Sequence, residues 1–302
     1  MGGFDALVLL GPTASGKTRL GVQLARSLGG EILSADSRQV YRGLDIGTGK
    51  DLQEYRTGGE VVPYHLIDIV DLDSEFSVFA FQKTFFESFR EVTRRKTLPV
   101  VVGGTGLYLD ALISGYNLVE TPENRELRTA LSDLSDEELV QRLQLLKSRL
   151  HNTTDLVDRN RLIRAIEIAE YSCGHSSVPT PQIRPLVLGT QWERSILRKR
   201  IGERLKARLD AGLVEEVEQL HEKGISWERL EWFGLEYRYI TGFLRGQIKS
   251  KNDLFQKLNS AIAQFAKKQE TWFRRMERNG VRIHWIPEAE FDSAMQVVSE
   301  NE

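Results

Sequence analysis

The feature that most constrains the fold is a glycine-rich segment near the start of the chain. Gly11–Thr18 reads Gly-Pro-Thr-Ala-Ser-Gly-Lys-Thr and matches the pattern Gly-x4-Gly-Lys-[Ser/Thr]. The apolar run Ala6–Leu10 before it predicts a buried strand, and residues 18–28 after it have apolar side chains at helical spacing. A strand, a glycine turn and a helix in this order are typical of a phosphate-binding loop (P-loop).

The chemistry of this loop suits an anion. Glycines let the backbone curl so that amide N–H groups point inward, and the following helix N-terminus adds partial positive charge. We expect Lys17 to neutralise phosphate oxygens and the Thr18 hydroxyl to hold Mg²⁺. The predicted phosphate site comprises Gly11, Pro12, Thr13, Ala14, Ser15, Gly16, Lys17 and Thr18. The motif indicates a di- or triphosphate and leaves the reaction open.

Further apolar segments alternate with helical ones. Strands are expected at 31–34, 65–70, 99–102 and 186–188, with a helix at 79–94. This alternation predicts an α/β fold, a P-loop NTPase-like parallel sheet with helices on both faces. Residues 123–171 and 193–278 have helical patterns, and the proline-rich segment 176–185 has the composition of a linker.

These patterns predict a division of the chain into four stretches. The first part of the α/β core is expected at 1–116, and a helical insertion subdomain at 117–159. A return to the core is expected at 160–192, followed by a C-terminal helical region at 193–302 that completes it.

Composition excludes several classes of protein. Of the 302 residues, 40% are hydrophobic, and the net charge of −2 excludes a disordered chain or a uniformly basic one. No apolar run approaches the roughly 20 residues of a membrane span, and no secretory signal is visible, so we expect a cytoplasmic protein. The single cysteine, Cys173, excludes an intrachain disulfide.

The sequence also limits the reaction. The Asn-Lys-x-Asp motif of switch GTPases is missing, as is an apolar run ending in Asp-Glu, which mechanical ATPases usually carry. A small-metabolite kinase remains open. Asp36 follows the expected second strand, at the edge where open α/β sheets bind ligands. Position alone is compatible with a partner of Mg²⁺, a general base, or an aspartate that stabilises a turn.

Longer motifs carry a resemblance to a known family. Asp36–Thr48, read after the glycine-rich loop, resembles the tRNA dimethylallyltransferase (tRNA isopentenyltransferase) family. Further matching segments follow in order at 63–68, 76–78, 102–108, 161–167, 200–204 and 266–272. The resemblance implies transfer of a dimethylallyl group from dimethylallyl diphosphate to the N6 amine of an adenosine in tRNA. The acceptor would lie immediately 3′ of the anticodon, at position thirty-seven.

The resemblance also implies roles for individual residues at the donor site. Asp36 would be the general base, and Thr13 would contact the reacting groups. Lys17 and Mg²⁺ would stabilise departing pyrophosphate. Arg200 would clamp the diphosphate, with Arg204 one helical turn away.

The acceptor implied by the resemblance is the anticodon stem-loop of tRNA, bound by a monomer. An enzyme acting on a stacked base must first extrude it. The implied contacts to the flipped base and its entrance channel are Ser37, Arg38, Gln39 and Thr105, beside Asp36. Those to the anticodon loop are Asn160, Arg161, Leu162, Ile163 and Arg164, with 117–159 as an RNA-gripping subdomain. Lys267, Arg274 and Arg278 share one helix face, expected to contact phosphates, while Phe265, Trp272 and Met276 form an expected core face.

Some segments depart from the family pattern. Residues 47–51 read Gly-Thr-Gly-Lys-Asp where Gly-Thr-Ala-Lys-Pro is usual. Residues 234–238 are longer than the usual Gly-Tyr-[Arg/Lys], Ala263 replaces a common arginine, and 146–158 lacks an Asp-Pro-x-x-Ala stretch. We interpret these as changes at the RNA-facing periphery that leave the donor site intact.

Three alternatives remain. An adenylate isopentenyltransferase would act on free AMP, ADP or ATP, but it would need neither Arg161 and Arg164 nor the helices after Glu193. A small-molecule P-loop kinase would consume ATP. A non-enzymatic nucleic-acid-binding protein would not need Thr13, Lys17, Thr18 and Asp36 together.

Overall fold

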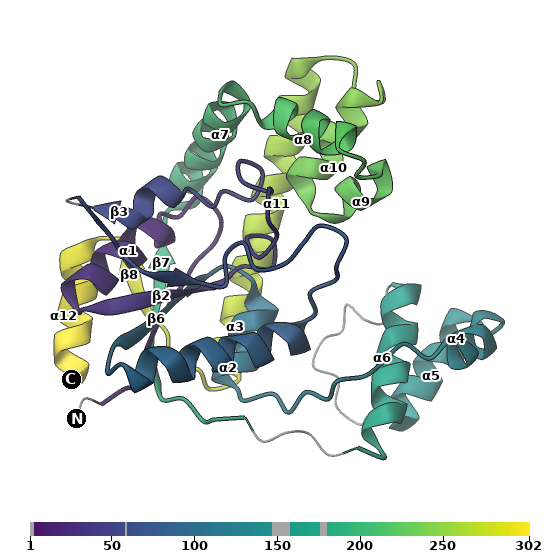
Figure 1. Ribbon diagram of the computed structural model, residues 1–302, viewed down its shortest axis with the longest axis horizontal. Coiled ribbons are helices and arrows are strands. Elements are labelled where there is room, and N and C mark those ends of the chain that lie inside the picture. The colour runs from purple at the N-terminus through teal and green to yellow at the C-terminus, as the bar shows by residue number, and fades with distance from the viewer. Residues whose placement is uncertain (1–2, 58, 147–157, 176–179) are drawn as a thin grey trace. The chain divides into compact units, whose positions relative to one another are not determined.

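The computed structural model describes residues 3–57, 59–146, 158–175 and 180–302. The chain divides into two compact units. Met1–Gly115 and Gln182–Glu302 form the large unit, and Tyr116–Pro181 form the small one. Figure 1 shows the strands and most of the helices in the large unit.

A parallel sheet organises the large unit. In its described part, the strand order is β5-β2-β6-β1-β7-β8. The strands are β1 (Ala6–Leu10), β2 (Gly30–Ala35), β5 (Tyr64–His65), β6 (Leu98–Gly103), β7 (Pro185–Gln191) and β8 (His284–Pro287). A separate antiparallel pair joins β3 (Arg56–Thr57) to β4 (Glu60–Val61). The predicted α/β class with a parallel sheet is confirmed.

The two faces of the sheet carry different helices, because successive strand residues point to opposite sides. Ala6, Val8 and Leu10 pack against α2 (Val78–Arg94), α3 (Gly106–Ile113) and the end of α11 (Lys251–Arg278). On the opposite face, Leu7 and Leu9 pack against α1 (Lys17–Ser27) and α12 (Phe291–Asn301).

Helices also cover the segment that follows β2. Val40, Tyr41 and Leu44 share a buried cluster with α8 (Leu213–Glu222), α9 (Trp227–Trp232) and α10 (Leu235–Leu244). α7 (Arg194–Asp210) packs against α11, and a short 3₁₀ helix spans Leu52–Tyr55. The C-terminal helices therefore position both the loop after β2 and, through α7, side chains near the glycine-rich loop.

In the part of the small unit that the structure describes, three helices form a cluster. It contains α4 (Arg125–Ser132), α5 (Asp136–Leu146) and α6 (Arg159–Ser172). Its buried core is Leu131, Leu139, Leu143, Leu162, Ile166 and Ala169. The expected return to the core at residue 160 is wrong, because the apolar side of α6 packs against α4 and α5.

Several other expectations need correction. The strand expected at 65–70 is mostly absent, because Leu66 (φ 66°) and Asp68 (φ 56°) take left-handed backbone conformations that end β5. β8 and α12 were not predicted. The departure at 146–158 falls almost wholly outside the described residues.

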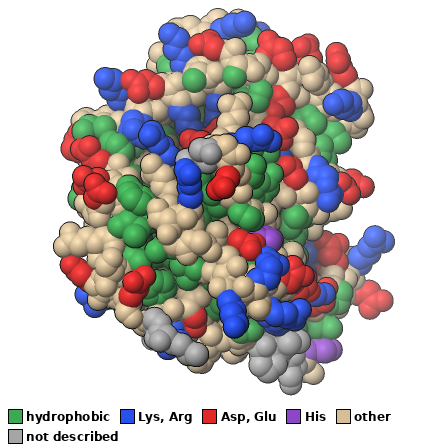
Figure 2. Space-filling model, turned by 60° about the vertical axis from the view of Figure 1, so that its left-hand side comes forward, with side chains coloured by type: hydrophobic (Ala, Val, Ile, Leu, Met, Phe, Trp, Pro, Cys, Tyr) green, Lys and Arg blue, Asp and Glu red, His purple; other side chains and the backbone are tan. Residues whose placement is uncertain are grey.

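The surface matches the near-neutral composition. Figure 2 shows Lys and Arg side chains interspersed with Asp and Glu on the face drawn. Within the described residues, no helix combines the length and the apolar character needed to cross a membrane.

Candidate active site

The glycine-rich loop connects β1 to α1 and takes an unusual backbone course. Gly16 (φ 85°) and Ala14 (φ 61°) both adopt left-handed conformations. β7, which pairs with β1, fixes the loop from one side. The Thr190 hydroxyl donates to Ser15 Oγ at 2.7 Å, and Trp192 Nε1 donates to the Ser15 carbonyl at 2.8 Å.

Gln269 fixes the loop from the other side. Its Oε1 accepts from the Thr13 amide at 2.9 Å, and its Nε2 donates to the Gly104 carbonyl at 2.8 Å. The buried side chain thus joins the loop after β1 to the turn after β6. The sequence analysis did not predict this role, although Gln269 lies inside the matching segment 266–272. The signal that could have predicted it is a polar residue on the apolar face of an amphipathic helix.

Lys17 lies over the loop that it follows. Its Nζ donates to the Pro12 carbonyl at 3.2 Å. Burial, and next the positive charge of Arg204, lower the pKa of Lys17 to about 8. A lysine held this way gains strongly from a bound anion, which restores preference for the charged form.

α7 brings two of the predicted residues to the loop. Arg200 Nε donates to the Ala14 carbonyl at 3.0 Å, and its guanidinium stacks 4.1 Å from the centre of the Trp192 ring. Arg204 Nη1 lies 3.4 Å from Thr13 Oγ1. Both arginines thus border the loop, where the family resemblance implied that they would lie.

Arg208, a further turn along α7, was not predicted. Its side chain is 12% exposed, and within the described residues its Nε and Nη2 have no hydrogen-bond partner. The pKa of Arg208 is lowered, first by burial and then by the charge of Arg204. Unsatisfied buried donors are costly, so these atoms indicate a place for an anionic ligand.

Asp36 lies at the carboxyl end of β2, beside the turn after β6. Ala35 pairs with Gly103, and Leu10 also pairs with Gly103, so the three strand ends adjoin. Asp36 Oδ1 accepts from the Arg38 amide at 2.9 Å. Asp36 therefore stabilises a turn, as one of the open alternatives stated, while its carboxylate stays beside the loop.

Thr105 and Ser37 are brought together next to Asp36. Thr105 Oγ1 accepts from the Ser37 amide at 3.0 Å and lies 3.4 Å from Ser37 Oγ. Arg38 stacks on Trp232, 4.7 Å from the ring centre. These side chains surround the same strand edge as the glycine-rich loop.

Gln39 points elsewhere. It is 8% exposed, accepts from the Ser34 hydroxyl at 3.1 Å and donates to the Gly49 carbonyl at 3.0 Å. The implied base contact does not match this geometry, because both ends of the amide are bonded within the protein.

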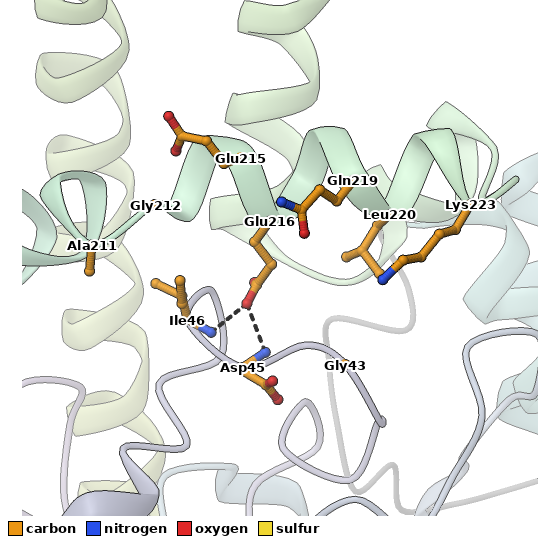
Figure 3. Close-up of a pocket in the computed structure, with 10 residues that line it drawn as sticks. All are labelled: Gly43, Asp45, Ile46, Ala211, Gly212, Glu215, Glu216, Gln219, Leu220 and Lys223. Carbon is orange, nitrogen blue, oxygen red and sulfur yellow. Dashed lines mark hydrogen bonds between the residues drawn. The ribbon is translucent and has the colours of Figure 1, made fainter.

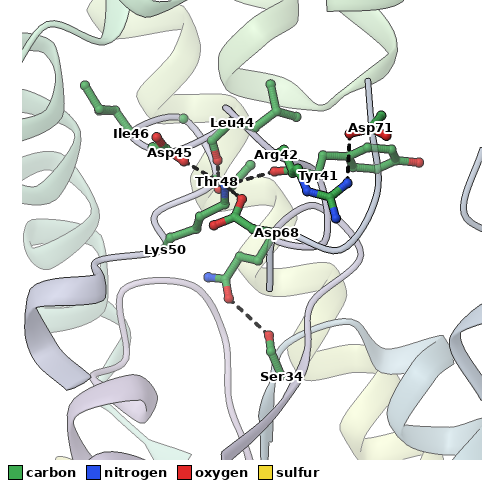
Figure 4. Close-up of polar contacts among 12 residues, drawn as sticks. Ser34, Tyr41, Arg42, Leu44, Asp45, Ile46, Thr48, Lys50, Asp68 and Asp71 are labelled. Carbon is green, nitrogen blue, oxygen red and sulfur yellow. Dashed lines mark hydrogen bonds and ion pairs between the residues drawn. The ribbon is translucent and has the colours of Figure 1, made fainter. Parts of the chain in front are cut away.

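Two charged side chains hold the segment 41–51. Lys50 belongs to the segment itself, and Glu216 lies on α8. Lys50 is buried, donates to the Tyr41 carbonyl at 2.9 Å and pairs with Asp45 and Asp68 (Figure 4). Glu216 of α8 accepts from the amides of Asp45, Ile46 and Gly47 at 2.7–3.1 Å; the first two bonds are drawn in Figure 3. These bonds fix the segment that leads from Asp36 to Asp51.

The interpretation that the departures affect only the RNA-facing periphery is wrong for this segment. Asp51 Oδ2 is 2.6 Å from Arg204 Nη2, at the donor side of the site. In the 234–238 segment, Glu236 lies 3.8 Å from Arg208, and Tyr237 is buried and donates to Glu216 at 2.7 Å. Ala263 packs in the interface between α7 and α11.

The predicted RNA residues of α6 have different surroundings. Asn160 and Arg161 are exposed, whereas Leu162 is 1% exposed and belongs to the core of the small unit. Ile163 packs against the same core. Arg164 pairs with the buried Glu167 and donates to the Thr121 carbonyl at 2.7 Å. A helix cannot expose five consecutive residues, so Leu162 is corrected to a core residue.

The basic face of α11 is exposed as expected. Lys267, Arg274 and Arg278 all lie on the surface, with Arg274 Nη2 3.5 Å from Glu270. Of the expected core face, Met276 is buried, but Phe265 is 43% exposed.

Comparisons with known proteins identify the family. The IPP transferase family model matches residues 39–276, and the isopentenyl transferase family model matches residues 4–60. A tRNA dimethylallyltransferase from Geotalea uraniireducens is 60% identical over 93% of this chain and 92% of its own. The chain belongs to the tRNA dimethylallyltransferase family. It is therefore a prenyltransferase, as its motifs implied.

A further relative and two solved structures are also similar to the chain. A relative from Syntrophotalea carbinolica is 60% identical over 93% of this chain and 94% of its own. The crystal structure of a tRNA isopentenylpyrophosphate transferase from Bacillus halodurans is similar, with a TM-score of 0.69, 32% identity and coverage of 98% and 95%. A eukaryotic dimethylallyltransferase acting on tRNA shares the fold, with a TM-score of 0.76 and 23% identity over 98% and 76% of the chains.

Proposed function

We propose that this chain transfers the dimethylallyl group of dimethylallyl diphosphate to the N6 amine of the adenosine 3′ of the anticodon in tRNA. The observation that carries the donor half is the convergence of Lys17, Arg200 and Arg204 on the glycine-rich loop. Two unsatisfied buried donors of Arg208 add to the same positive surface. This arrangement fits a diphosphate leaving group whose charge grows as the C–O bond breaks.

The residues also fit a magnesium ion that arrives with the donor. Within the described residues, no three His, Cys, Asp or Glu side chains are grouped to hold a metal. The Thr18 hydroxyl would hold Mg²⁺, with the diphosphate supplying further oxygens. When bound, Mg²⁺ supplies charge neutralisation at the departing pyrophosphate.

The acceptor half rests on the strand edge beside the loop. An exocyclic adenine amine is a weak nucleophile, and the Asp36 carboxylate would take its proton as the new C–N bond forms. Ser37, Arg38 and Thr105 surround the place where an extruded base would enter. Asn160 and Arg161 would contact the anticodon loop, and Lys267 and Arg274 would contact phosphates. We further propose a cytoplasmic monomer with the small unit as an RNA-binding module.

One assay tests this function against its alternatives. The protein is incubated with labelled dimethylallyl diphosphate and Mg²⁺, with either tRNA or AMP as acceptor. We expect label in tRNA and none in AMP, without a requirement for ATP. Label in AMP would support the adenylate isopentenyltransferase, and ATP consumption without prenyl transfer would support a kinase.

A further inference from the structure

Asp51 lies directly on the arginines that border the glycine-rich loop. Its Oδ2 is 2.6 Å from Arg204 Nη2 and 3.8 Å from Arg208 Nη2. Arg204 also reaches Thr13 Oγ1 at 3.4 Å, so the paired guanidinium borders the loop itself. The Asp51 carboxylate therefore offsets positive charge that a diphosphate would use.

The backbone is shaped to bring this carboxylate in. Gly49 (φ 62°) and Asp51 (φ 46°) both adopt left-handed conformations. A Cβ at Gly49 would lie 1.5 Å from Arg208 Nη2 and 2.5 Å from Arg204 Nη2, so glycine admits both guanidiniums. Aspartate tolerates the left-handed region better than most residues, whereas proline is excluded from it. Glycine at position 49 and aspartate at position 51 thus both allow the carboxylate to reach the arginines.

The contact is charged and partly open to water. Burial by itself raises the pKa of Asp51, but Arg204 and then Arg208 outweigh it and hold the pKa below its usual value. The carboxylate is therefore ionised at neutral pH. The Asp51 side chain is 39% exposed, so it can turn into water when another anion takes its place. Two buried donors of Arg208 remain unsatisfied while Asp51 is in position.

We propose that Asp51 occupies the place beside Arg204 and Arg208 in the donor site until a diphosphate displaces it. The inference rests on the proposed function, in which the glycine-rich loop takes dimethylallyl diphosphate. The incoming diphosphate bonds to Arg204 and satisfies Arg208, and Asp51 swings outward. Asp51 then lies close to the bound anion and repels it. It lowers the affinity for donor and pyrophosphate alike, and so hastens pyrophosphate release.

A purely structural role for Asp51 predicts the opposite sign. If Asp51 served to hold Arg204 in its binding position, removing its charge would weaken diphosphate binding. Glu54 and Glu236 also lie near the arginines, but burial raises the pKa of each carboxyl. Asp51 is the carboxylate in direct contact with Arg204, and its charge is the one to remove.

The test is a calorimetric titration with inorganic pyrophosphate and Mg²⁺. The variant is Asp51→Asn, which keeps a side-chain oxygen and tolerates the left-handed backbone. The matched control is Asp71→Asn, which breaks the exposed Arg42–Asp71 pair at 2.8 Å. We expect Asp51→Asn to lower the pyrophosphate Kd by about 3- to 10-fold, the effect of one nearby like charge in a partly hydrated site. Asp71→Asn should match the wild type.

Each other outcome has a defined meaning. Equal or weaker pyrophosphate binding by Asp51→Asn, with normal binding by the wild type, would overturn the displacement role and leave the proposed function standing. No binding by either protein would overturn the proposed function and this inference with it. In steady-state transfer, the variant should lower the KM for dimethylallyl diphosphate without raising kcat, because pyrophosphate leaves more slowly.

Discussion

At the scale of single residues, the proposed donor site is a concentration of positive charge enclosed by the fold. Burial, and next the positive charge of Arg204, lower the pKa values of Lys17 and Arg208. Asp51 offsets part of this positive charge when no ligand is present. We expect a bound diphosphate to favour the charged forms of these side chains, because a nearby anion stabilises a cation.

The first prediction concerns the pH dependence of anion binding. The pKa of Lys17 is lowered to about 8, and the charged form binds phosphate. Below about pH 8, Lys17 is charged and contributes fully. Above it the charged population falls, so the pyrophosphate Kd should rise by up to about tenfold per pH unit. Calorimetry from pH 6.5 to 9.5 measures this, with Lys17→Gln correcting for titration of pyrophosphate itself. Parallel curves for the two proteins would contradict it.

The second prediction concerns Asp36 as the proton acceptor. Asp36→Asn keeps an oxygen for the Arg38 amide, so the turn survives and only proton acceptance is lost. We expect kcat to fall by roughly 10²–10⁴-fold, the usual contribution of general-base catalysis. Donor and tRNA affinities should change little. Single-turnover kinetics on a sample with an unchanged melting temperature measures this. A normal single-turnover rate would remove Asp36 from the chemistry.

At the scale of elements, the parallel sheet sets the site and the C-terminal helices complete it. β1, β2 and β6 deliver the glycine-rich loop, Asp36 and Thr105 to one edge. α7 and α11 then bring arginines and Gln269 from more than 150 residues away in sequence. α8 holds the 41–51 segment through one carboxylate.

The third prediction tests that carboxylate. Glu216 accepts three backbone amides and the Tyr237 hydroxyl. Glu216→Ala leaves these donors without their partner and should lower the free energy of unfolding by about 2–4 kcal/mol. Denaturant unfolding measures the loss, with the exposed Glu215→Ala on the same helix as the control. Equal stabilities of the two variants would show that water replaces the carboxylate at no cost.

The sequence predicted those elements that depend on interactions between residues close together in the chain. The glycine-rich loop, β1, α1 and β6 depend on short-range periodicity and turn chemistry, and they are where the sequence placed them. The end of β5 depends on left-handed Leu66 and Asp68, which no local pattern requires. Arg208 and Gln269 were not predicted because their places in the site depend on contacts with residues more than 150 positions away. Leu162 was placed among RNA contacts because motif resemblance does not tell buried from exposed positions.

At the scale of the whole molecule, two compact units divide the proposed work. The large unit holds the proposed donor site and the proposed proton acceptor, Asp36. The small unit presents Arg161 on its surface and keeps Arg164 in an internal ion pair. We therefore expect Arg161 to contribute to tRNA binding and Arg164 to contribute to stability.

The fourth prediction separates those roles. Arg161→Ala should reduce the slope of log K against log salt for tRNA binding by about one unit, with stability unchanged. Arg164→Ala deprives Glu167, whose side chain is 1% exposed, of one partner and should lower the melting temperature. Salt titrations and thermal unfolding of both variants decide this. A slope change in Arg164→Ala with full stability would reverse the assignment.

The proposed reaction is prenyl transfer to one adenosine of tRNA. The most direct measurement uses two anticodon stem-loops that differ only in carrying adenosine or guanosine at position thirty-seven. Each is incubated with the protein, dimethylallyl diphosphate and Mg²⁺, and its nucleosides are analysed by mass spectrometry. The account predicts one N6-dimethylallyladenosine per adenosine stem-loop and none in the guanosine control. Equal modification of both RNAs, or of neither while AMP is modified, would contradict it.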